Sequence, residues 1–361
     1  MQIPTKTMQN KNHGLNLQLE FQHQSVEDWV CGIGEAVHGL AEDIDNPLLY
    51  LPRGEIQRGR EDTMDCATRG PVNILEPKFN YVVQNHILAP EDEKWLIDNY
   101  ANEEGEIEFS DAWVAIGSGT TQSGNSLKAP LDFMRKNGLI PKKMLPLESW
   151  MTWADYHNKK RLTQVMQDIA HDFWLRFTIN YEKVYAKEYD EVRKYDFLDT
   201  AGFAWPTPVN GIYPKNDNPF NHCWVEIPKQ IKQTIFDNYP DSCDGDFIKR
   251  LAPDYNLFPY SYRVIINAVN TYVQSHEVTT EQIATVWRKR KDLQLEFPQP
   301  DMVSIHNPNY SIFDWARERG VNENPEVFNS DIHFTPIAEV DPFYIKFWKV
   351  VKKFGGWLSS K

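Results

Sequence analysis

The sequence predicts an α+β fold in which the helices come first and the strands second. Up to about residue 192, apolar residues recur mainly at the three-to-four spacing of helices. From about residue 202 to 269, short segments rich in Val, Ile, Tyr, Phe and Trp alternate with Pro, Gly, Asn and Asp, which is typical of strands and turns. Separate runs of helices and strands indicate α+β rather than alternating α/β architecture.

The composition is that of a folded protein with an acidic surface. Of its 361 residues, 19 are Phe, 16 Tyr and 12 Trp, so disorder is not expected over most of the chain. The net charge of −13 argues against a nucleic-acid partner, because phosphate backbones need surplus cations. No run approaches the length of a membrane span, and the first residues lack the apolar core of a signal peptide. We therefore expect a cytoplasmic protein, or a virion-associated one if it is phage-encoded.

The cysteines point to a reducing compartment. Their spacings fit no paired zinc motif, and four cysteines in a chain of this length do not resemble a secreted disulfide scaffold. They are Cys31, Cys66, Cys223 and Cys243. We expect no metal and no cofactor.

The first 65 residues are expected to hold little regular structure. Residues 1–25 are polar, which predicts an arm, and residues 26–45 have apolar residues at mixed helical spacing, which predicts one or two short helices. Residues 1–50 would thus form an N-terminal arm and helical segment. Residues 51–65 are polar and rich in breakers, which predicts a loop, and a helix over about 66–77 follows.

Three further helices are expected before the strands. Pro90 at a favoured first-turn position, followed by acidic residues, predicts a helix over 90–100. Residues 126–138 read as a helix stopped by Asn137-Gly138. Apolar residues repeat at helical spacing over 159–192, and we expect residues from about 147 to 195 to form a helical insert.

The second half should contain strands and then a mixed extension. The strands are expected at 202–214, 222–228, 233–239 and 260–269. They would complete a domain spanning 51–275. Residues 276–361 would be a mixed, largely helical extension, with a capping box at Thr279 and Gln282 and a basic amphipathic helix after Asp341-Pro342. Such a helix most often packs on its own domain.

Cys66 is the candidate nucleophile. It directly precedes a predicted helix, whose free N–H groups and dipole would favour a thiolate. A thiolate needs a base, and histidine suits that role near neutral pH. His222 is the candidate, because it opens the apolar strand HCWVEI.

Two more groups would complete such a site. Asp237 lies at the end of the next predicted strand, where it could orient the imidazole. An oxyanion would need donors, and the backbone N–H of Cys66 could act with the side chain of Gln57, which is the one Asn or Gln between residues 47 and 66.

Each of these residues also has a structural explanation. Cys66 could be a buried inert thiol and His222 a structural strand histidine. Asp237 could cap a turn, and Gln57 could belong to a polar surface loop. Cys223 adjoins His222, and since side chains alternate along a strand, we expect it to face away from the cleft.

The order of several segments resembles the papain-like cysteine peptidases. DCATRGPVNILE (65–76) is similar to the family's active-site helix, which carries a glutamate ten residues after the nucleophile, the place of Glu76. FSDAW (109–113) and GNSLKAPLDFMRKNGLIPKKMLP (124–146) are similar to its next helix and cleft loop. NGIYP (210–214), NHCWVEI and DNY (237–239) are similar to its segments around the catalytic histidine and third residue.

This resemblance, over about residues 50–270, implies a papain-like fold of a helical subdomain and a β-rich, barrel-like subdomain. It also implies a thiol-dependent endopeptidase acting on a polypeptide substrate through Cys66, His222, Asp237 and Gln57. The chain departs from the family at Met64, Asp65 and Ala67, and Asp237 stands in place of the usual asparagine. An ionised Asp65 would oppose the thiolate unless it caps the helix.

These departures keep two other functions open. The chain could be a catalytically inactive papain-like protein used for binding or assembly, for example a phage structural protein with virion partners. It could also be a peptidoglycan-cutting cysteine hydrolase, although those enzymes usually have a much shorter separation between the cysteine and the histidine than the 222 − 66 = 156 residues found here.

Overall fold

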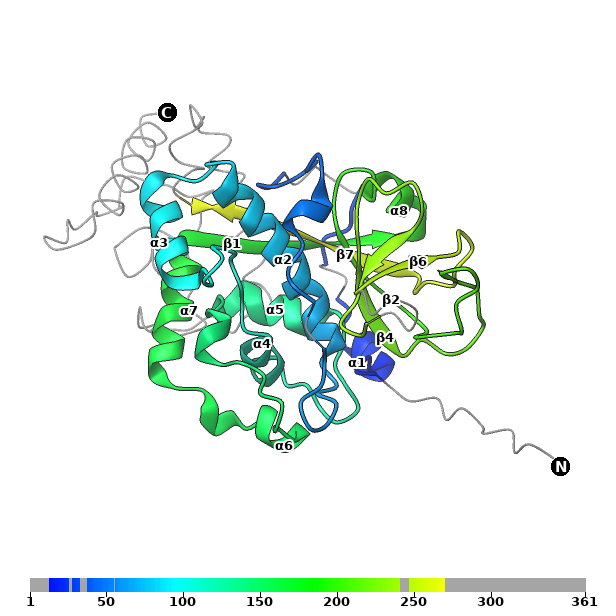
Figure 1. Ribbon diagram of the computed structural model, residues 1–361, viewed down its shortest axis with the longest axis horizontal. Coiled ribbons are helices and arrows are strands. Elements are labelled where there is room, and N and C mark those ends of the chain that lie inside the picture. Colours follow the sequence, from blue (N-terminus) through cyan, green and yellow to red (C-terminus); the bar gives the residue numbers. More distant parts are fainter. Residues whose placement is uncertain (1–12, 26–27, 33–37, 55, 241–246, 270–361) are drawn as a thin grey trace, which may run out of the picture.

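The structure analysed is a computed structural model, which describes residues 13–25, 28–32, 38–54, 56–240 and 247–269 (Figure 1). The α+β prediction is confirmed, with a seven-stranded sheet and most of the helices packed to one side of it. The predicted extension over 276–361, with both of its helices, lies outside the described residues.

The sheet is mostly antiparallel and has the strand order β1-β7-β2-β4-β5-β6-β3. Only the β3–β6 pair is parallel among the strand pairs of the described residues. The strands are β1 Phe177–Tyr185, β2 Leu198–Gly202, β3 Ile212–Tyr213, β4 His222–Glu226, β5 Thr234–Phe236, β6 Ile248–Leu251 and β7 Tyr260–Ala268. The expected strand over 202–214 is therefore wrong over most of its length, and only its two ends belong to strands.

Strand β1 corrects the predicted long helix over 159–192 and the helical insert over about 147–195. Helix α7 (Gln164–Arg176) ends where β1 begins, and a second helix, α8 (Ala186–Val192), follows the strand. β1 pairs with β7 along its whole length, from Phe177 opposite Ala268 to Tyr185 opposite Tyr260. The nine residues of antiparallel pairing with β7 stabilise Phe177–Tyr185 as a strand, although its apolar residues continue the helical spacing of α7.

Helix α2 (Cys66–Gln84) runs through the middle of the molecule, between the other helices and the sheet (Figure 1). Its expected end near residue 77 is wrong, because the helix continues past Pro77. A proline removes one backbone donor, but Phe79, Val82 and Val83 beyond it are buried in the core, and this packing keeps the helix intact. α2 packs on β4, β2 and β7.

Helices α3, α4, α5 and α7 form the part of the molecule on the far side of α2 from the short strands, whereas α1 and α8 lie on the side of those strands (Figure 1). The predicted helices over 90–100 and 126–138 are confirmed as α3 and α5, and Gly138 ends α5 with a φ of 69°. The remaining helices are α1 Leu17–Gln22, α3 Pro90–Tyr100, α4 Asp111–Gly117, α5 Lys128–Asn137 and α6 Trp153–Tyr156, with 3-10 turns at Pro47–Tyr50, Lys142–Met144 and Lys159–Arg161.

The N-terminal segment differs from the predicted arm and helices. From residue 13 onward it packs on the body, with Leu15, Ala41 and Ile44 in the core and α1 within the supposed arm. The described residues of 26–45 form no helix and instead make isolated bridges, Val30 with Lys183 and Leu40 with Ile266. These bridges join the segment to β1 and β7, and such long-range pairing cannot be read from short-range apolar spacing.

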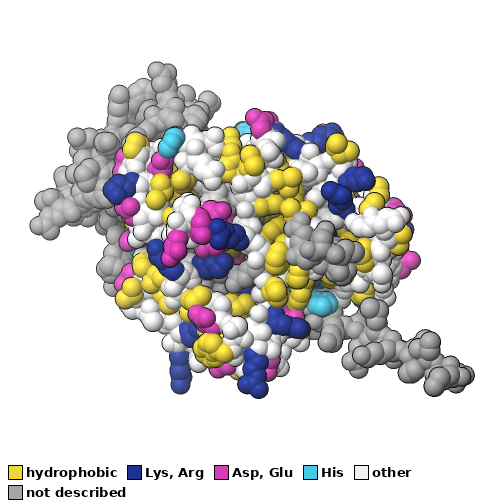
Figure 2. Space-filling model, in the orientation of Figure 1, with side chains coloured by type: hydrophobic (Ala, Val, Ile, Leu, Met, Phe, Trp, Pro, Cys, Tyr) yellow, Lys and Arg dark blue, Asp and Glu magenta, His cyan; other side chains and the backbone are white. Residues whose placement is uncertain are grey.

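Charges of both signs are mixed on the face shown in Figure 2, with a band of hydrophobic side chains near its middle. The net charge of −13 is therefore not gathered into one acidic area on this face. None of the helices in the described ranges is long and apolar enough to cross a membrane.

Candidate active site

Cys66 is the first residue of α2, as the sequence predicts, and its side chain is buried. The helix starts there because the backbone carbonyl of Asp65 accepts hydrogen bonds from the N–H groups of Thr68 and Arg69, at 2.8 and 3.0 Å. The N–H groups of the first turn and the helix dipole therefore lie at the sulfur.

The Asp65 carboxylate does not cap the helix. Its Oδ1 accepts from Arg69 Nε at 3.0 Å, and its Oδ2 accepts from the Tyr156 hydroxyl at 2.7 Å. Burial raises the pKa of Asp65, but Arg69 and the hydrogen bonds outweigh this, so that the pKa is lowered and the carboxylate is charged. Because Arg69 compensates that charge, Asp65 does not act as a bare anion against a thiolate.

His222 and Asp237 are brought together. His222 is the first residue of β4, and Asp237 directly follows β5, its neighbour in the sheet. The ring Nε2–H donates to Asp237 Oδ1 at 2.6 Å, and both side chains are fully buried. This bond fixes the ring and leaves Nδ1 for the thiol of Cys66, which interacts with His222.

Cys66 and His222 affect each other's protonation. Nδ1 of His222 has no hydrogen bond of standard geometry to any described residue, although Cys66 is near enough to affect the ring's charge. Hydrogen bonds of this kind often tighten only when a substrate binds.

Lys249 in β6 is a member of the site that the sequence did not reveal. Its Nζ donates to Asp237 Oδ2 at 2.9 Å and to the carbonyl of Tyr239, and it lies 5.2 Å from the centre of the Trp205 ring. It is as buried as its partner. Both oxygens of the Asp237 carboxylate thus face a cation, and the only sequence signal was a lysine at an inward position of a short strand.

Cys223 corrects a prediction, since it does not face away from the site. Its thiol and its backbone N–H lie near enough to the Cys66 sulfur to lower the pKa of the Cys66 thiol by hydrogen bonding. Alternation along β4 is kept: Cys223 packs in the core with α2, while Trp224 lies in the cluster on the other face. Cys66 lies near both His222 and Cys223 because the N-terminus of α2 packs at the start of β4.

These contacts set the protonation of the pair. Burial alone would raise the pKa of the Cys66 thiol, but the hydrogen bond from Cys223 and the charge of His222 lower it to about 7. Burial likewise disfavours a charged His222, but Asp237 and Cys66 raise its pKa to about 10. Between these two values the pair is a thiolate and an imidazolium.

Gln57 also lies at the site and is fully buried. Its Nε2 donates to the backbone carbonyl of His13 at 2.8 Å and to Asp62 Oδ1 at 3.1 Å. Gly14, the next residue of the chain, packs directly on the backbone of Met64 and Cys66. The side chain of Gln57 therefore donates to a peptide carbonyl beside the nucleophile candidate.

Aromatic rings enclose His222. Trp205 meets it edge-on at 5.6 Å, and Tyr239 lies at 5.3 Å. They limit access of water to the bond between His222 and Asp237, which strengthens that bond. Among the described residues, no group of three or more His, Cys, Asp or Glu side chains converges as metal ligands.

Comparison with known proteins gives likenesses of fold only. No family model and no curated protein matches the sequence. Among solved structures the chain is similar to xylellain, a cysteine protease from Xylella fastidiosa, with 12% identity and a TM-score of 0.42 over 71% of this chain and 97% of that chain. It is also similar to a structure from work on antibody cross-reactivity between the mite allergens Blo t 1 and Der p 1, with 10% identity and a TM-score of 0.43 over 70% and 78%.

A third similar structure holds the cysteine protease and lectin-like domains of Cwp84, a surface-layer-associated protein of Clostridium difficile. Its identity is 11% and its TM-score 0.43, over 72% of this chain and 61% of that chain. At such identities and TM-scores, the case for any activity rests on the residues of the site itself.

The first prediction concerns the charge of Cys66. Its lowered pKa means that the thiolate forms as the pH rises through about 7, while His222 keeps its proton up to about pH 10. The difference in ultraviolet thiolate absorbance between the wild-type chain and Cys66→Ser should show the lower midpoint. A midpoint at or above that of an ordinary cysteine, about 8.5, would contradict the ion pair.

The second prediction concerns Cys223. Replacing it with alanine removes the hydrogen bond that stabilises the thiolate, so the pKa of Cys66 should rise in Cys223→Ala. Cys223→Ser keeps a donor at the same place and should retain the low value. The same absorbance titration checks both, and an identical midpoint in Cys223→Ala and wild type would show that the contact has no electrostatic role.

The third prediction concerns the ion pair of Asp237 and Lys249. Asp237→Asn or Lys249→Met alone leaves one buried charge without its partner, which should cost about 3–5 kcal/mol of the free energy of unfolding. The double variant removes both charges and should be more stable than either single variant. Denaturant unfolding of the four chains measures this, and additive losses would mean that the two side chains are not coupled.

Proposed function

We propose that this chain is a thiol-dependent cysteine endopeptidase whose nucleophile is Cys66, with His222 as its base and acid. The observation that carries the proposal is the order Cys66, His222, Asp237 within one buried site, with the sulfur at a helix N-terminus. A thiolate paired with an imidazolium is the reactive form of such a site, and here it is favoured from about pH 7.

The first chemical step is attack of the Cys66 thiolate on the carbonyl carbon of a peptide bond. The developing oxyanion needs donors, and the Gln57 side-chain amide with the Cys66 N–H would supply them. Nδ1–H of His222 then gives its proton to the leaving amine as the C–N bond breaks. Asp237 keeps the ring in place and stabilises its charge throughout.

The second step is hydrolysis of the acyl-enzyme. Neutral His222 takes a proton from water, whose oxygen attacks the thioester carbonyl, and the thiolate leaves. The balance is one water consumed per peptide bond broken. No step calls for a group other than these side chains and the substrate.

Polypeptide is the substrate class that the contacts favour. Gln57 Nε2 donates to the carbonyl of a peptide group, that of His13, and a backbone lies against the N–H of Cys66. A donor placed for a main-chain carbonyl suits a protein substrate.

The departures from the papain pattern do not favour the inactive alternative. Asp65 is neutralised by Arg69, and Asp237 in place of asparagine is balanced by Lys249. The site therefore keeps the charge balance that the reaction needs, and the assembly role, the virion partners and the cytoplasmic location stay predictions from the sequence.

The fourth prediction is that peptide cleavage depends on Cys66. Digestion of a denatured protein, with new termini mapped by mass spectrometry, should fall on the order of 10³-fold or more in Cys66→Ser, while the melting temperature stays nearly unchanged. His222→Gln should be impaired as well. Equal cleavage by Cys66→Ser and wild type, or a lack of cleavage by the wild-type chain, would disprove the mechanism.

A further inference from the structure

The side-chain amide of Gln57 has two ends, and only one of them suits an oxyanion. Its Nε2 end carries two hydrogens, whereas its Oε1 end would repel a developing negative charge. The side chain is fully buried, and Oε1 has no hydrogen-bond partner among the described residues. The partners of Nε2 therefore decide which way the amide points.

The Asp62 carboxylate is one of these partners, and it accepts from three donors at the site. Its Oδ1 accepts from Gln57 Nε2 at 3.1 Å and from the backbone N–H of Met64 at 2.9 Å. Its Oδ2 accepts from the Tyr239 hydroxyl. Because a carboxylate only accepts hydrogen bonds, Asp62 fixes the NH2 end of the amide on its own side.

The second hydrogen of Nε2 is directed at a main-chain carbonyl. This carbonyl belongs to His13, whose oxygen lies 2.8 Å from Nε2, and the next residue packs on the backbone of Cys66. The two N–H bonds diverge within the plane of the amide, so that holding one of them sets the direction of the other. Asp62 thus directs the donor that the proposed mechanism needs.

The chain between Gln57 and Cys66 folds back and brings Asp62 beside the amide. Arg58 pairs with Asp62 in an antiparallel bridge, and the N–H of Thr63 donates to the Gln57 carbonyl at 3.3 Å. The position of the carboxylate is therefore set by the backbone of this loop as well as by its own hydrogen bonds.

The loop is also fixed to the segment that directly follows Asp237. The N–H of Gln57 donates to the carbonyl of Asn238 at 3.1 Å, and the Tyr239 hydroxyl donates to Asp62. Burial and the Asp62 carboxylate raise the pKa of Tyr239, so that its hydroxyl keeps the proton that it donates. The oxyanion donor is thus held in register with the residue that orients the base.

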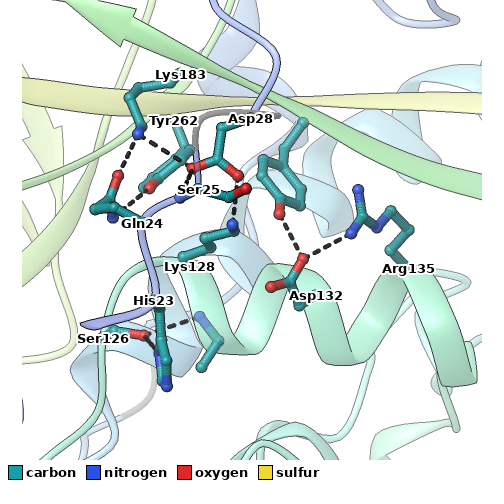
Figure 3. A network of polar contacts seen from close by, with 12 residues as sticks. His23, Gln24, Ser25, Asp28, Ser126, Lys128, Asp132, Arg135, Lys183 and Tyr262 are labelled. Carbon is teal, nitrogen blue, oxygen red and sulfur yellow. Dashed lines mark hydrogen bonds and ion pairs between the residues drawn. The ribbon is translucent and has the colours of Figure 1, made fainter. Parts of the chain in front are cut away.

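The partners of Asp62 differ from those of a carboxylate buried elsewhere in the chain. Asp28 lies between the ammonium groups of Lys128 and Lys183 (Figure 3). Asp62 forms no ion pair with any described residue, and its three donors are neutral. Because Asp62 is only half-buried, water hydrates part of its carboxylate, and no cation is needed to offset its charge. Its hydrogen bonds therefore serve to fix geometry.

We infer that Asp62 is the positioning residue of the oxyanion donor, which holds the Gln57 amide with Nε2 toward the carbonyl that Cys66 attacks. The inference rests on the proposed function, because an oxyanion forms only when Cys66 attacks a carbonyl carbon. Asp62 takes part in no bond change and acts only through Gln57. Without this acceptor the amide can turn about its last side-chain bond and place Oε1 where the negative charge develops.

The fifth prediction compares two reactions of Cys66, of which only one forms an oxyanion. p-Nitrophenyl acetate acylates a thiolate through a tetrahedral oxyanion, whereas iodoacetamide alkylates it by direct displacement of iodide. Asp62→Ala should lower the rate of acylation about tenfold or more and leave alkylation within about twofold of wild type. Mass spectrometry of Cys66 in the full-length chain measures both rates, at a pH above its pKa of about 7.

The ratio of the two rates is the quantity compared between chains. Both reagents react with the same buried thiol, so a change in access to Cys66 or in its ionisation alters both rates and leaves their ratio unchanged. A merely structural role of Asp62 would therefore not move the ratio.

Asp62→Asn is the conservative variant. Its amide oxygen can still accept from Gln57 and Met64, and its NH2 group then faces the Tyr239 hydroxyl, which accepts as well as donates. This variant should retain most of the ratio, although it has lost the charge. An equal loss in Asp62→Asn and Asp62→Ala would overturn the assignment of the effect to the hydrogen bond.

A double variant tests whether Asp62 acts through Gln57. Gln57→Ala alone should lower the ratio, because it removes the donor itself. Adding Asp62→Ala to it should cause no further loss, since the group that Asp62 positions is already gone.

Glu61→Ala is the matched control. Glu61 lies in the same loop, but its Oε2 accepts from the N–H of Trp153 at 2.9 Å, so its removal should leave the ratio unchanged. Asp62→Ser is a second test variant should Asp62→Ala fold poorly. Its hydroxyl can make the local turn to Met64 but is one bond shorter toward the amide, so the ratio should fall. Circular dichroism checks that each chain is folded.

The outcomes separate this inference from the proposed function. An unchanged ratio in folded Asp62→Ala and Asp62→Ser, a further loss in the double variant, or no acylation of Cys66 in any chain would overturn the role of Asp62, whether or not the chain cleaves peptides. A lower ratio with no peptide cleavage by wild type would support this role and reject the peptidase. A lower ratio together with a fall in kcat at nearly constant KM for peptide cleavage would support both.

Discussion

The Asp237 carboxylate is the group on which the arrangement of the site depends. It is fully buried, and a buried charge is tolerated only when partners compensate it on every side. His222 takes one oxygen and Lys249 the other, while the backbone N–H of Asn238 also donates to Oδ1 at 2.8 Å. Since these bonds come from β4, β6 and the end of β5, the carboxylate joins three elements of the sheet and turns the imidazole toward Cys66.

The contacts of the same carboxylate explain why residue 237 is an aspartate here and not the asparagine of the papain pattern. A thiolate, an imidazolium, a carboxylate and an ammonium sum to zero charge, so the buried group as a whole is neutral when Cys66 is ionised. An asparagine at 237 would leave the buried Lys249 without its counter-charge. The buried charge of Asp237 is therefore tolerated because Lys249 compensates it, and the buried charge of Lys249 is tolerated because Asp237 compensates it.

The sequence predicted what is local and missed what depends on packing. Cys66 at a helix start, His222 at a strand start and Asp237 after the next strand could all be read from short patterns, because each is set by the element that carries it. The role of Lys249 could not be read in this way, because it depends on how β6 pairs with β5 and on which of its side chains then meets Asp237.

The errors in the fold have the same origin. Phe177–Tyr185 follows a helix without a breaker, and only its pairing with β7 makes it a strand. Residues 13–22 have the composition of a polar arm. Glu20 is nevertheless buried, because the hydroxyls of Tyr260 and Tyr262 in β7 donate hydrogen bonds to its carboxylate. Cys223 does alternate with His222 along β4. Alternation does not predict that the N-terminus of α2, and with it Cys66, packs beside Cys223.

The burial of Cys66 and His222 is compatible with their ionisation. Burial under His13–Asn16 works against both charges of the Cys66–His222 pair, yet the pKa of Cys66 remains about 7 and that of His222 about 10. In this dry environment the attraction between the pair, and the donors from Cys223 and α2, outweigh the loss of hydration. Cys66 is therefore charged near neutral pH although residues 13–16 cover it, so its charge does not depend on contact with solvent.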